Sequence, residues 1–229
     1  MWTSDLTMMM LEGIRDTLLM TLMSTLFGYV FGLPLGIALT VTDKTGIKPN
    51  VVVYKVLDVI VNIARSIPFL ILLILVMPLT RAIVGKTTGS VATIVPLTLA
   101  AAPFIGRMIE SSLKEVDHGV IEAAQSMGAD TLTIIWRVLL VEARTSILVG
   151  VTIAIGTILG YSAMAGVVGG GGLGDIAMRY GYYRYETLIM IVSVVLLVLL
   201  VQVFQSLYPP SAEGKGDAGD ASGGEDRQT

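Results

Sequence analysis

The stretch TLLMTLMSTLFGYVFGLPLGIALTV, residues 17–41, contains no charged side chain. An α-helix crosses the apolar core of a bilayer with about 20 mainly apolar residues, because each residue advances it by about 1.5 Å. A second uncharged stretch covers residues 187–208. The two stretches together predict a protein that crosses a membrane more than once.

Three further apolar segments lie between these two stretches. The fold class that we predict is therefore all-α, a polytopic membrane protein with five transmembrane helices per chain. Pro34 lies inside the first helix, where we expect a kink. The five predicted spans are residues 17–41, 56–80, 90–113, 147–168 and 187–208.

Composition supports this class and excludes several others. Apolar residues make up 54% of the chain and charged residues 14%, whereas a soluble domain carries about 25% charged residues. The chain has no cysteine and a single histidine, which excludes a disulfide framework and a histidine-rich metal centre. The net charge of −3 arises entirely from residues 211–229. The rest of the chain carries equal numbers of acidic and basic residues, which argues against nucleic acid as a partner.

The distribution of basic residues predicts the orientation in the membrane. They are more frequent in the segments that are cytoplasmic if the N-terminus is outside and the C-terminus inside. The acidic N-terminal residues resemble no secretory signal, so we expect a retained first helix. We predict a permease domain over residues 1–208 and a disordered, acidic, cytoplasmic tail over residues 209–229.

Between the third and fourth spans, residues 114–146 are too polar to cross a membrane but rich in helix-forming residues. Residues 118–144 read HGVIEAAQSMGADTLTIIWRVLLVEAR. Gly128 fits the left-handed position that ends a helix, and Asp130 fits the N-cap of the next helix. The pattern predicts a helix, a tight turn and a second helix on the cytoplasmic face.

This segment resembles the EAA signature of permeases in ATP-driven (ABC) importers. The matching residues are Glu122, Ala123, Ala124 and Gly128, followed after nine residues by Val138-Leu139-Leu140-Val141. Val141 stands where the family usually has proline, so we expect the last turn to continue as regular helix. The alternative is a cytoplasmic helical hairpin without a partner.

The resemblance implies a coupling role for Glu122, Ala123, Ala124, Gly128 and Ala129. In this family the short helix docks in a cleft of a separate ATPase subunit. ATP and Mg are then bound by that partner, and no cofactor is implied for this chain. The resemblance also implies two ATPase copies, a homodimer of permeases, an extracytoplasmic substrate-binding lipoprotein, and a location in the bacterial inner membrane among its lipids.

Further stretches are similar to permeases of methionine importers in particular. They imply a substrate path for methionine, the L-form and, as an open alternative, the D-form, by alternating access. One alternative is an importer of the same class for a polar amino acid or an osmoprotectant. A second is a channel or carrier that needs no ATP. The stretches are NIARSIPF (62–69), IVPLT (94–98), AAPFI (101–105), GYSAMAG (160–166) and GGGGLG (169–174).

Five residues within these stretches are candidates for a role in transport. The resemblance assigns Met164 to the closed gate, although a methionine facing lipid or the core is the alternative. A charged side chain inside the membrane costs free energy, so Arg65 is a candidate for the translocation path. Ser66, Tyr161 and Ser162 are further candidates. Arg65 could instead pair with Asp58 or extend toward the membrane surface.

Two glycine-containing stretches mimic nucleotide-binding motifs. Residues 80–87 lack the first glycine and the preceding strand of a P-loop, so we expect a connecting loop outside the membrane. Residues 169–174 are expected to form a flexible turn at the outer end of the fourth span. His118 is expected to be a solvated residue at a helix start. We therefore expect a chain that is not itself an enzyme.

Overall fold

The computed structural model describes residues 4–206, and these residues form helices without any strand. The predicted tail, residues 209–229, lies outside the described part of the chain. The elements are α1 (Ser4–Thr42), α2 (Val51–Ser66), α3 (Phe69–Leu75), α4 (Met77–Val84), α5 (Ser90–Lys114), α6 (His118–Ser126), α7 (Thr131–Ile134), a π-helical turn η1 (Ile135–Leu139), α8 (Leu140–Glu142), α9 (Arg144–Ala165), a 3-10 turn η2 (Gly166–Val168), α10 (Gly172–Ile176), a π-helical turn η3 (Ala177–Tyr182) and α11 (Thr187–Ser206).

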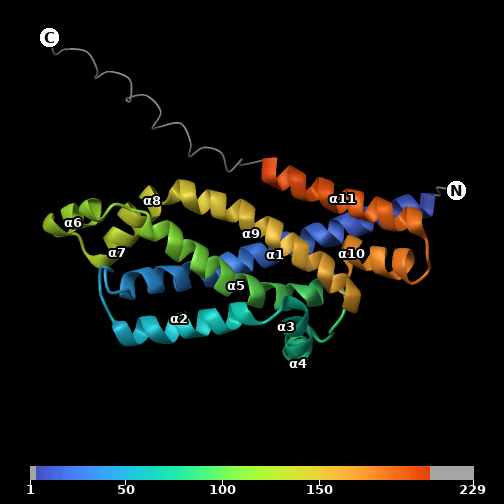
Figure 1. Ribbon diagram of the computed structural model, residues 1–229, viewed down its shortest axis with the longest axis horizontal. Coiled ribbons are helices and arrows are strands. Elements are labelled where there is room, and N and C mark those ends of the chain that lie inside the picture. Colours follow the sequence, from blue (N-terminus) through green and yellow to red (C-terminus); the bar gives the residue numbers. More distant parts are fainter. Residues whose placement is uncertain (1–3, 207–229) are drawn as a thin grey trace, which may run out of the picture.

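The prediction of an all-helical, multi-pass membrane protein is confirmed. Within the described residues, four helical runs are long and apolar enough to cross a bilayer, and the bent pair α2–α3 raises the number to five if it counts as one crossing. The first helix is longer than predicted, because it begins at Ser4 and includes the acidic residues before position 17. Figure 1 shows the N-terminal end of α1 opposite the end of the bundle that carries α6 and α7.

The centre of the bundle is the contact between α1 and α5. Three glycines of α1, spaced four residues apart, lie directly against the α5 backbone: Gly28, Gly32 and Gly36. A Cβ atom added at Gly36 would lie 2.6 Å from the carbonyl oxygen of Gly106 and from the Cβ of Ile109. Such close backbone approach through small residues at i and i+4 is a general device of membrane helix packing, because dispersion contacts increase as the axes approach.

Helix α9 closes the bundle on the other side of α5 and α1, and buries Ala154, Ile158 and Ala165. Helix α11 is apolar along most of its length, but only Ile189 and Ser193 are buried within this chain. Most of the apolar surface of α11 is not covered by its own chain. This surface is suited to contact lipid or another subunit.

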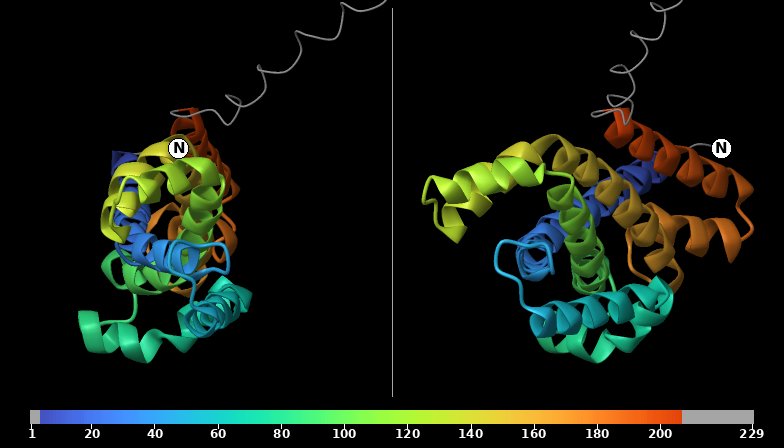
Figure 2. Two further views of the ribbon diagram at one scale, coloured as in Figure 1. Left: turned by 90° about the vertical axis from the view of Figure 1, so that its left-hand side faces the viewer. Right: turned by 60° about the vertical axis from the view of Figure 1, so that its left-hand side comes forward.

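The second predicted span, residues 56–80, is not a single straight helix. Helix α2 ends at Ser66, and α3 leaves it at an angle of 100°. The reason is local: Pro68 has no N–H for a helix hydrogen bond, and it forces the preceding residue out of the helical region, as the extended backbone of Ile67 shows (φ −79°, ψ 120°). Figure 2 shows α3 and α4 lying across the end of α2.

The glycine-rich residues 169–174 do not form the flexible turn that we expected. Gly172 adopts a left-handed conformation (φ 74°), and a Cβ there would lie 2.6 Å from Oγ1 of Thr17. The same Thr17 Oγ1 accepts a hydrogen bond from the backbone N–H of Leu173 (2.9 Å) and donates one to the Gly13 carbonyl (2.8 Å). An added Cβ would also lie 2.7 Å from the nearest backbone atom at Gly170 and 2.3 Å from it at Gly174, so this part of the chain is a close-packed junction.

Candidate coupling segment and transport path

The predicted helix–turn–helix on the polar end of the bundle is present as α6, a turn and α7. Asp117 caps α6 by accepting a hydrogen bond from the Gly119 N–H at 2.6 Å, and His118 is exposed at the first position, as expected. Gly128 has the predicted left-handed conformation (φ 82°), and Asp130 is the N-cap of α7. The side chain of Asp130 accepts a hydrogen bond from the hydroxyl of Thr133, which lowers the pKa of its carboxyl group.

Helix α6 presents two different faces. Ile121 and Ala124 are buried in the main core, whereas Glu122 and Ala123 point away from the bundle and are exposed. Nothing lies within 4 Å of a Cβ added at Gly128. The predicted coupling residues therefore form two groups. Ala124 and the half-buried Ala129 hold the segment on the bundle. Glu122, Ala123 and Gly128 remain accessible.

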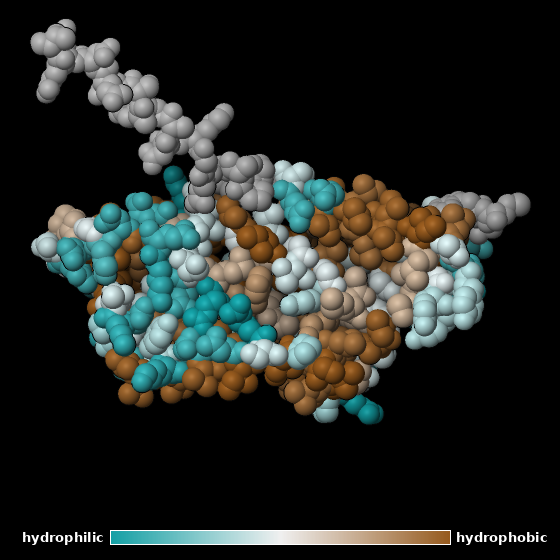
Figure 3. Space-filling model, viewed as in Figure 1, coloured by the Kyte–Doolittle hydropathy of each residue, from teal (hydrophilic) through white to brown (hydrophobic). Residues whose placement is uncertain are grey.

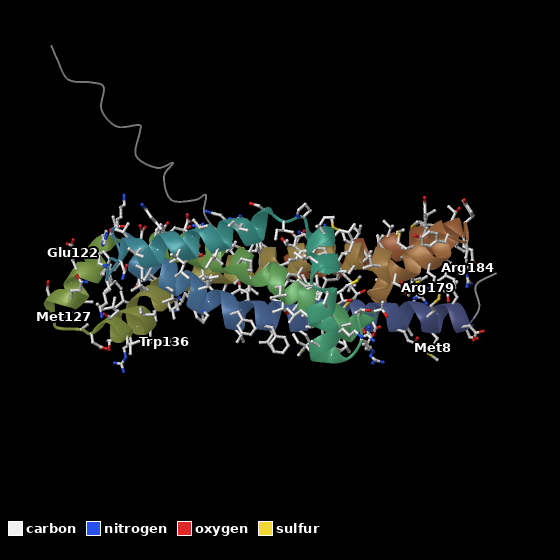
Figure 4. All side chains as sticks on the ribbon, turned by 90° about the horizontal axis from the view of Figure 1, so that it is seen from below. Met8, Glu122, Met127, Trp136, Arg179 and Arg184 are labelled. Atoms are coloured by element: carbon white, nitrogen blue, oxygen red, sulfur yellow. The ribbon has the colours of Figure 1, made fainter. Side chains whose placement is uncertain are left out.

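Large apolar side chains extend this exposed surface, and the sequence reasoning did not include them. Met127 is 82% exposed, Leu132 65% and Trp136 61%. Figure 4 shows Glu122, Met127 and Trp136 grouped at the same end of the molecule. Helical periodicity gave no signal for them, because Met127 follows Ala124 by three residues and the other two lie beyond the turn at Gly128. An exposed apolar patch of this kind is typical of a protein–protein contact.

The last turn of the segment does not continue as regular helix, contrary to the expectation from Val141. Residues Ile135–Leu139 form a π-helical turn, α8 contains only Leu140–Glu142, and the backbone bends at Ala143 (φ −77°, ψ 0°) before α9 begins. The segment is anchored by Ile134, Ile135 and Leu139, whose side chains are buried. A widened turn therefore precedes the bend into α9.

At the break between α2 and α3, the chain contacts α9. The rings of Phe69 and Tyr161 are stacked, with centroids 4.7 Å apart and planes inclined by 4°. Ser162 is buried, and its hydroxyl donates to the Leu159 carbonyl at 2.7 Å, so its side chain faces the bundle of its own chain. Of this predicted pair, Tyr161 is half-buried beside the break and Ser162 is turned away from the surface.

Met164 lies on an exposed stripe of α9. Its side chain is 51% exposed, and Ile153 and Val167 on the same helical face are 49% and 45% exposed. Between them, a Cβ added at Gly160 would meet no atom within 4 Å. The alternative of a core-facing Met164 is therefore excluded, and the stripe remains available to lipid or to a second copy.

Arg65 and Ser66 are exposed at the end of α2. The Ser66 hydroxyl donates to the Asn62 carbonyl at 2.7 Å. The considered ion pair between Arg65 and Asp58 is not formed, because the Asp58 carboxylate is bound by the guanidinium of Arg107 at 2.5 Å. Arg65 thus has no carboxylate partner among residues 4–206.

Sequence reasoning also missed an ionic cluster beside α6. It contains Arg107, Glu110 and Lys114 of α5, Asp58 of α2, and Asp43 of the loop after α1. A hydrogen bond from the Lys114 ammonium holds the pKa of the Asp43 carboxyl group below its ordinary value. The spacing of the three α5 residues at i, i+3 and i+7 places them on one helix face and was the available signal.

Comparison with known proteins gives one family and several similar chains. Residues 28–213 match the family described as binding-protein-dependent transport system inner membrane component. The chain is 53% identical over 169 residues to the probable D-methionine transport system permease protein MetI of Vibrio cholerae serotype O1, covering 74% of this chain and 75% of that protein.

Two further similarities extend the comparison. The methionine import system permease protein MetP of Bacillus subtilis is 43% identical over 167 residues, which cover 73% of this chain and 75% of that protein. A solved chain of the MetNI methionine ABC transporter, in an inward-facing conformation, matches with a TM-score of 0.88 and 46% identity and covers 90% of this chain and 95% of its own length.

Proposed function

Because this chain belongs to the family of binding-protein-dependent transport system inner membrane components, we propose that it is the permease subunit of an ATP-driven methionine importer. The named relatives support methionine as the substrate class. The observation that carries the proposal is the coupling segment, residues 114–146: a capped helix fixed to the bundle by Ile121 and Ala124, with Glu122 and Ala123 facing outward.

The proposed complex contains two copies of this chain, two ATPase subunits and an extracytoplasmic substrate-binding lipoprotein. ATP and Mg are bound by the ATPase subunits, and this chain contributes no catalytic residue and no cofactor site of its own. The exposed Met127, Leu132 and Trp136 support docking of the ATPase on the surface around α6. Closure of the ATPase pair moves this surface, and the anchored helices move with it as rigid bodies.

The gate is proposed to form where the α9 stripes of two copies meet. Gly160 allows close approach, and Met164 then projects toward its counterpart across the two-fold axis. The break at Ile67–Pro68 and the Phe69–Tyr161 stack lie beside this stripe, since Tyr161 is one turn before Met164. Arg65, Ser66 and Tyr161 are retained as candidates for the path; Ser162 would act there only through the packing of α9.

We place the chain in the bacterial inner membrane with the N-terminus outside and the C-terminus in the cytoplasm. The position of α6 at the end of the bundle opposite the start of α1 supports this orientation (Figure 1). Figure 3 shows that the hydrophilic surface is concentrated at the α6–α7 end, whereas apolar surface dominates along the rest of this face of the bundle.

The test is uptake into proteoliposomes that contain the purified complex with its binding protein. We expect ATP-dependent accumulation of labelled methionine that excess unlabelled methionine abolishes and glycine betaine or glutamine does not. Preferential uptake of betaine or a polar amino acid would favour the same class of importer with another substrate. Uptake without ATP, by a chain that never co-purifies with an ATPase, would refute the proposal.

A further inference from the structure

Helix α2 is amphipathic, but its apolar face points outward and its polar face points toward the bundle, the reverse of a helix in a soluble protein. Its apolar residues Val52, Val56 and Ile63 are 71%, 54% and 61% exposed. Its polar residues Asp58 and Asn62 lie one turn apart and face α5. Figure 3 shows the apolar edge along α2 with a hydrophilic strip directly beside it, toward α5. Since only Val61 of α2 is fully buried, apolar packing contributes little to holding this helix on the bundle.

Arg107 provides the polar attachment between α5 and α2. Its Nη2 contacts Oδ1 of Asp58 at 2.5 Å and donates to Oδ1 of Asn62 at 2.9 Å. Its Nη1 contacts Oε2 of Glu110, on its own helix, at 2.7 Å. The planar guanidinium can hold such partners in fixed directions at once, which an ammonium cannot do.

The network continues from Glu110 to the end of α5. Oε1 of Glu110 accepts hydrogen bonds from Lys114 Nζ at 2.8 Å and from the Tyr54 hydroxyl, on α2, at 3.3 Å. Lys114 also contacts Asp43, in the loop between α1 and α2, at 2.7 Å. Lys114 is the last residue of α5, and α6 begins at His118. A continuous set of charged contacts therefore joins the start of the coupling segment to α2.

We propose that Arg107 is a positioning residue that makes α2 follow the coupling segment during transport. The inference rests on the proposed function. Movement of α6 displaces the end of α5, and Arg107 transmits this displacement to Asp58 and Asn62. Helix α2 carries the broken helix at Ile67–Pro68, so its displacement reaches the stack of Phe69 on Tyr161 beside the gate.

The network acts as a rigid link and stays closed through the cycle. The Glu110 side chain is only 3% exposed, and breaking its contacts would leave a carboxylate in a poorly solvated site. Separating one partner from a buried ion pair is costly, whereas moving the whole pair as a unit is not. Helices α2 and α5 therefore move together. At Pro68 no helix hydrogen bond has to break, so the angle between α2 and α3 can change while the movement reaches Phe69.

The experiment compares variants of the intact complex in proteoliposomes by the number of methionine molecules taken up per ATP hydrolysed. We expect Asp58→Asn and Arg107→Gln to keep ATP hydrolysis but to lower this ratio roughly tenfold, a typical strength of coupling between sites. The double variant should be no worse than Arg107→Gln alone, because the two residues act through one contact. Arg107→Lys should give a ratio between those of Arg107→Gln and the wild type. It keeps the positive charge but loses the planar donor geometry of the guanidinium.

Lys55→Gln is the matched control, since it removes a cation from α2 that has no carboxylate partner within residues 4–206. Its ratio should equal that of the wild type. An unchanged ratio in Asp58→Asn, or independent losses that multiply in the double variant, would overturn the inference. If Arg107→Gln does not assemble, Asp58→Asn, whose carboxylate is 31% exposed, decides alone. A wild-type complex without ATP-dependent uptake would instead refute the proposed function.

Discussion

Two stripes of the bundle follow helical spacing, and they differ in whether this chain supplies their partner. The stripe of α1, with Gly28, Gly32 and Gly36, lies against α5 so closely that no Cβ atom fits. The stripe of α9, with Gly160 and Met164, is uncovered, and a Cβ at Gly160 meets open space. The first stripe builds the protomer, and the second has the properties expected of a surface that meets another copy or the lipid.

The largest effect is expected from breaking the α1 stripe. A leucine at Gly36 places its Cβ within 2.6 Å of a backbone oxygen of α5, which cannot retreat like a flexible side chain. We predict that Gly36→Leu prevents accumulation of a folded chain, because even ordinary overpacking costs about 1–3 kcal/mol. Size-exclusion chromatography of the solubilised protein checks this. Gly156→Ala is the control: its added Cβ meets its nearest atom at 3.8 Å, and it should behave like the wild type.

The α9 stripe should respond differently. Gly160→Leu fills space that is empty in a single chain, so the protomer should fold, whereas close approach of two copies should fail. We expect normal yield and helix content but a shift from the dimer to the monomer, measured by size-exclusion chromatography with light scattering. A fully dimeric Gly160→Leu protein would show that the α9 stripe faces lipid.

A smaller change on the α9 stripe, at Met164, tests whether this stripe forms the gate between two copies. Met164→Ala should leave assembly intact and let methionine pass without ATP, because three heavy atoms are lost from each side of the proposed seal. Met164→Cys should cross-link two copies in the resting complex, and the absence of native cysteine makes this readout clean. A complex that shows neither the leak nor the cross-link would place the gate elsewhere.

The smallest effect is expected at Asp43, at the edge of the ionic cluster. Its pKa is lowered chiefly by the hydrogen bond from Lys114, so its contribution to stability is present at neutral pH and is lost as the pH falls through its folded-state pKa. We predict that Asp43→Asn lowers the free energy of unfolding by less than about 1 kcal/mol at pH 7, as expected for a partly exposed pair. Below that pKa the difference should vanish, which thermal denaturation at several pH values can test.

The sequence predicted those parts of the fold that depend on local composition. Apolar length identified α5 and α11 almost to the residue, and Gly128 and Asp130 identified the ends of the coupling helices. The break at Pro68 was not predicted, because apolar length alone does not show where a helix bends, and the extended Ile67 turns the chain by 100°.

The remaining features depend on contacts between distant residues. Asp58 was considered as a partner for Arg65 on the same helix, but Arg107, brought close by the packing of α5, binds it instead. The glycines of residues 169–174 suggested flexibility, although Thr17 and the end of α9 enclose them. Sequence spacing cannot predict such pairs, because each depends on which helices become neighbours.

The most direct measurement is the response of the complete complex to Gly128→Leu. Leucine at a position with φ 82° is strained and projects into the space that the ATPase should occupy. Our account predicts an intact permease dimer that either fails to retain the ATPase or hydrolyses ATP without accumulating methionine. A Gly128→Leu complex that assembles and transports methionine at the wild-type rate would contradict the claim that transport is driven through this segment.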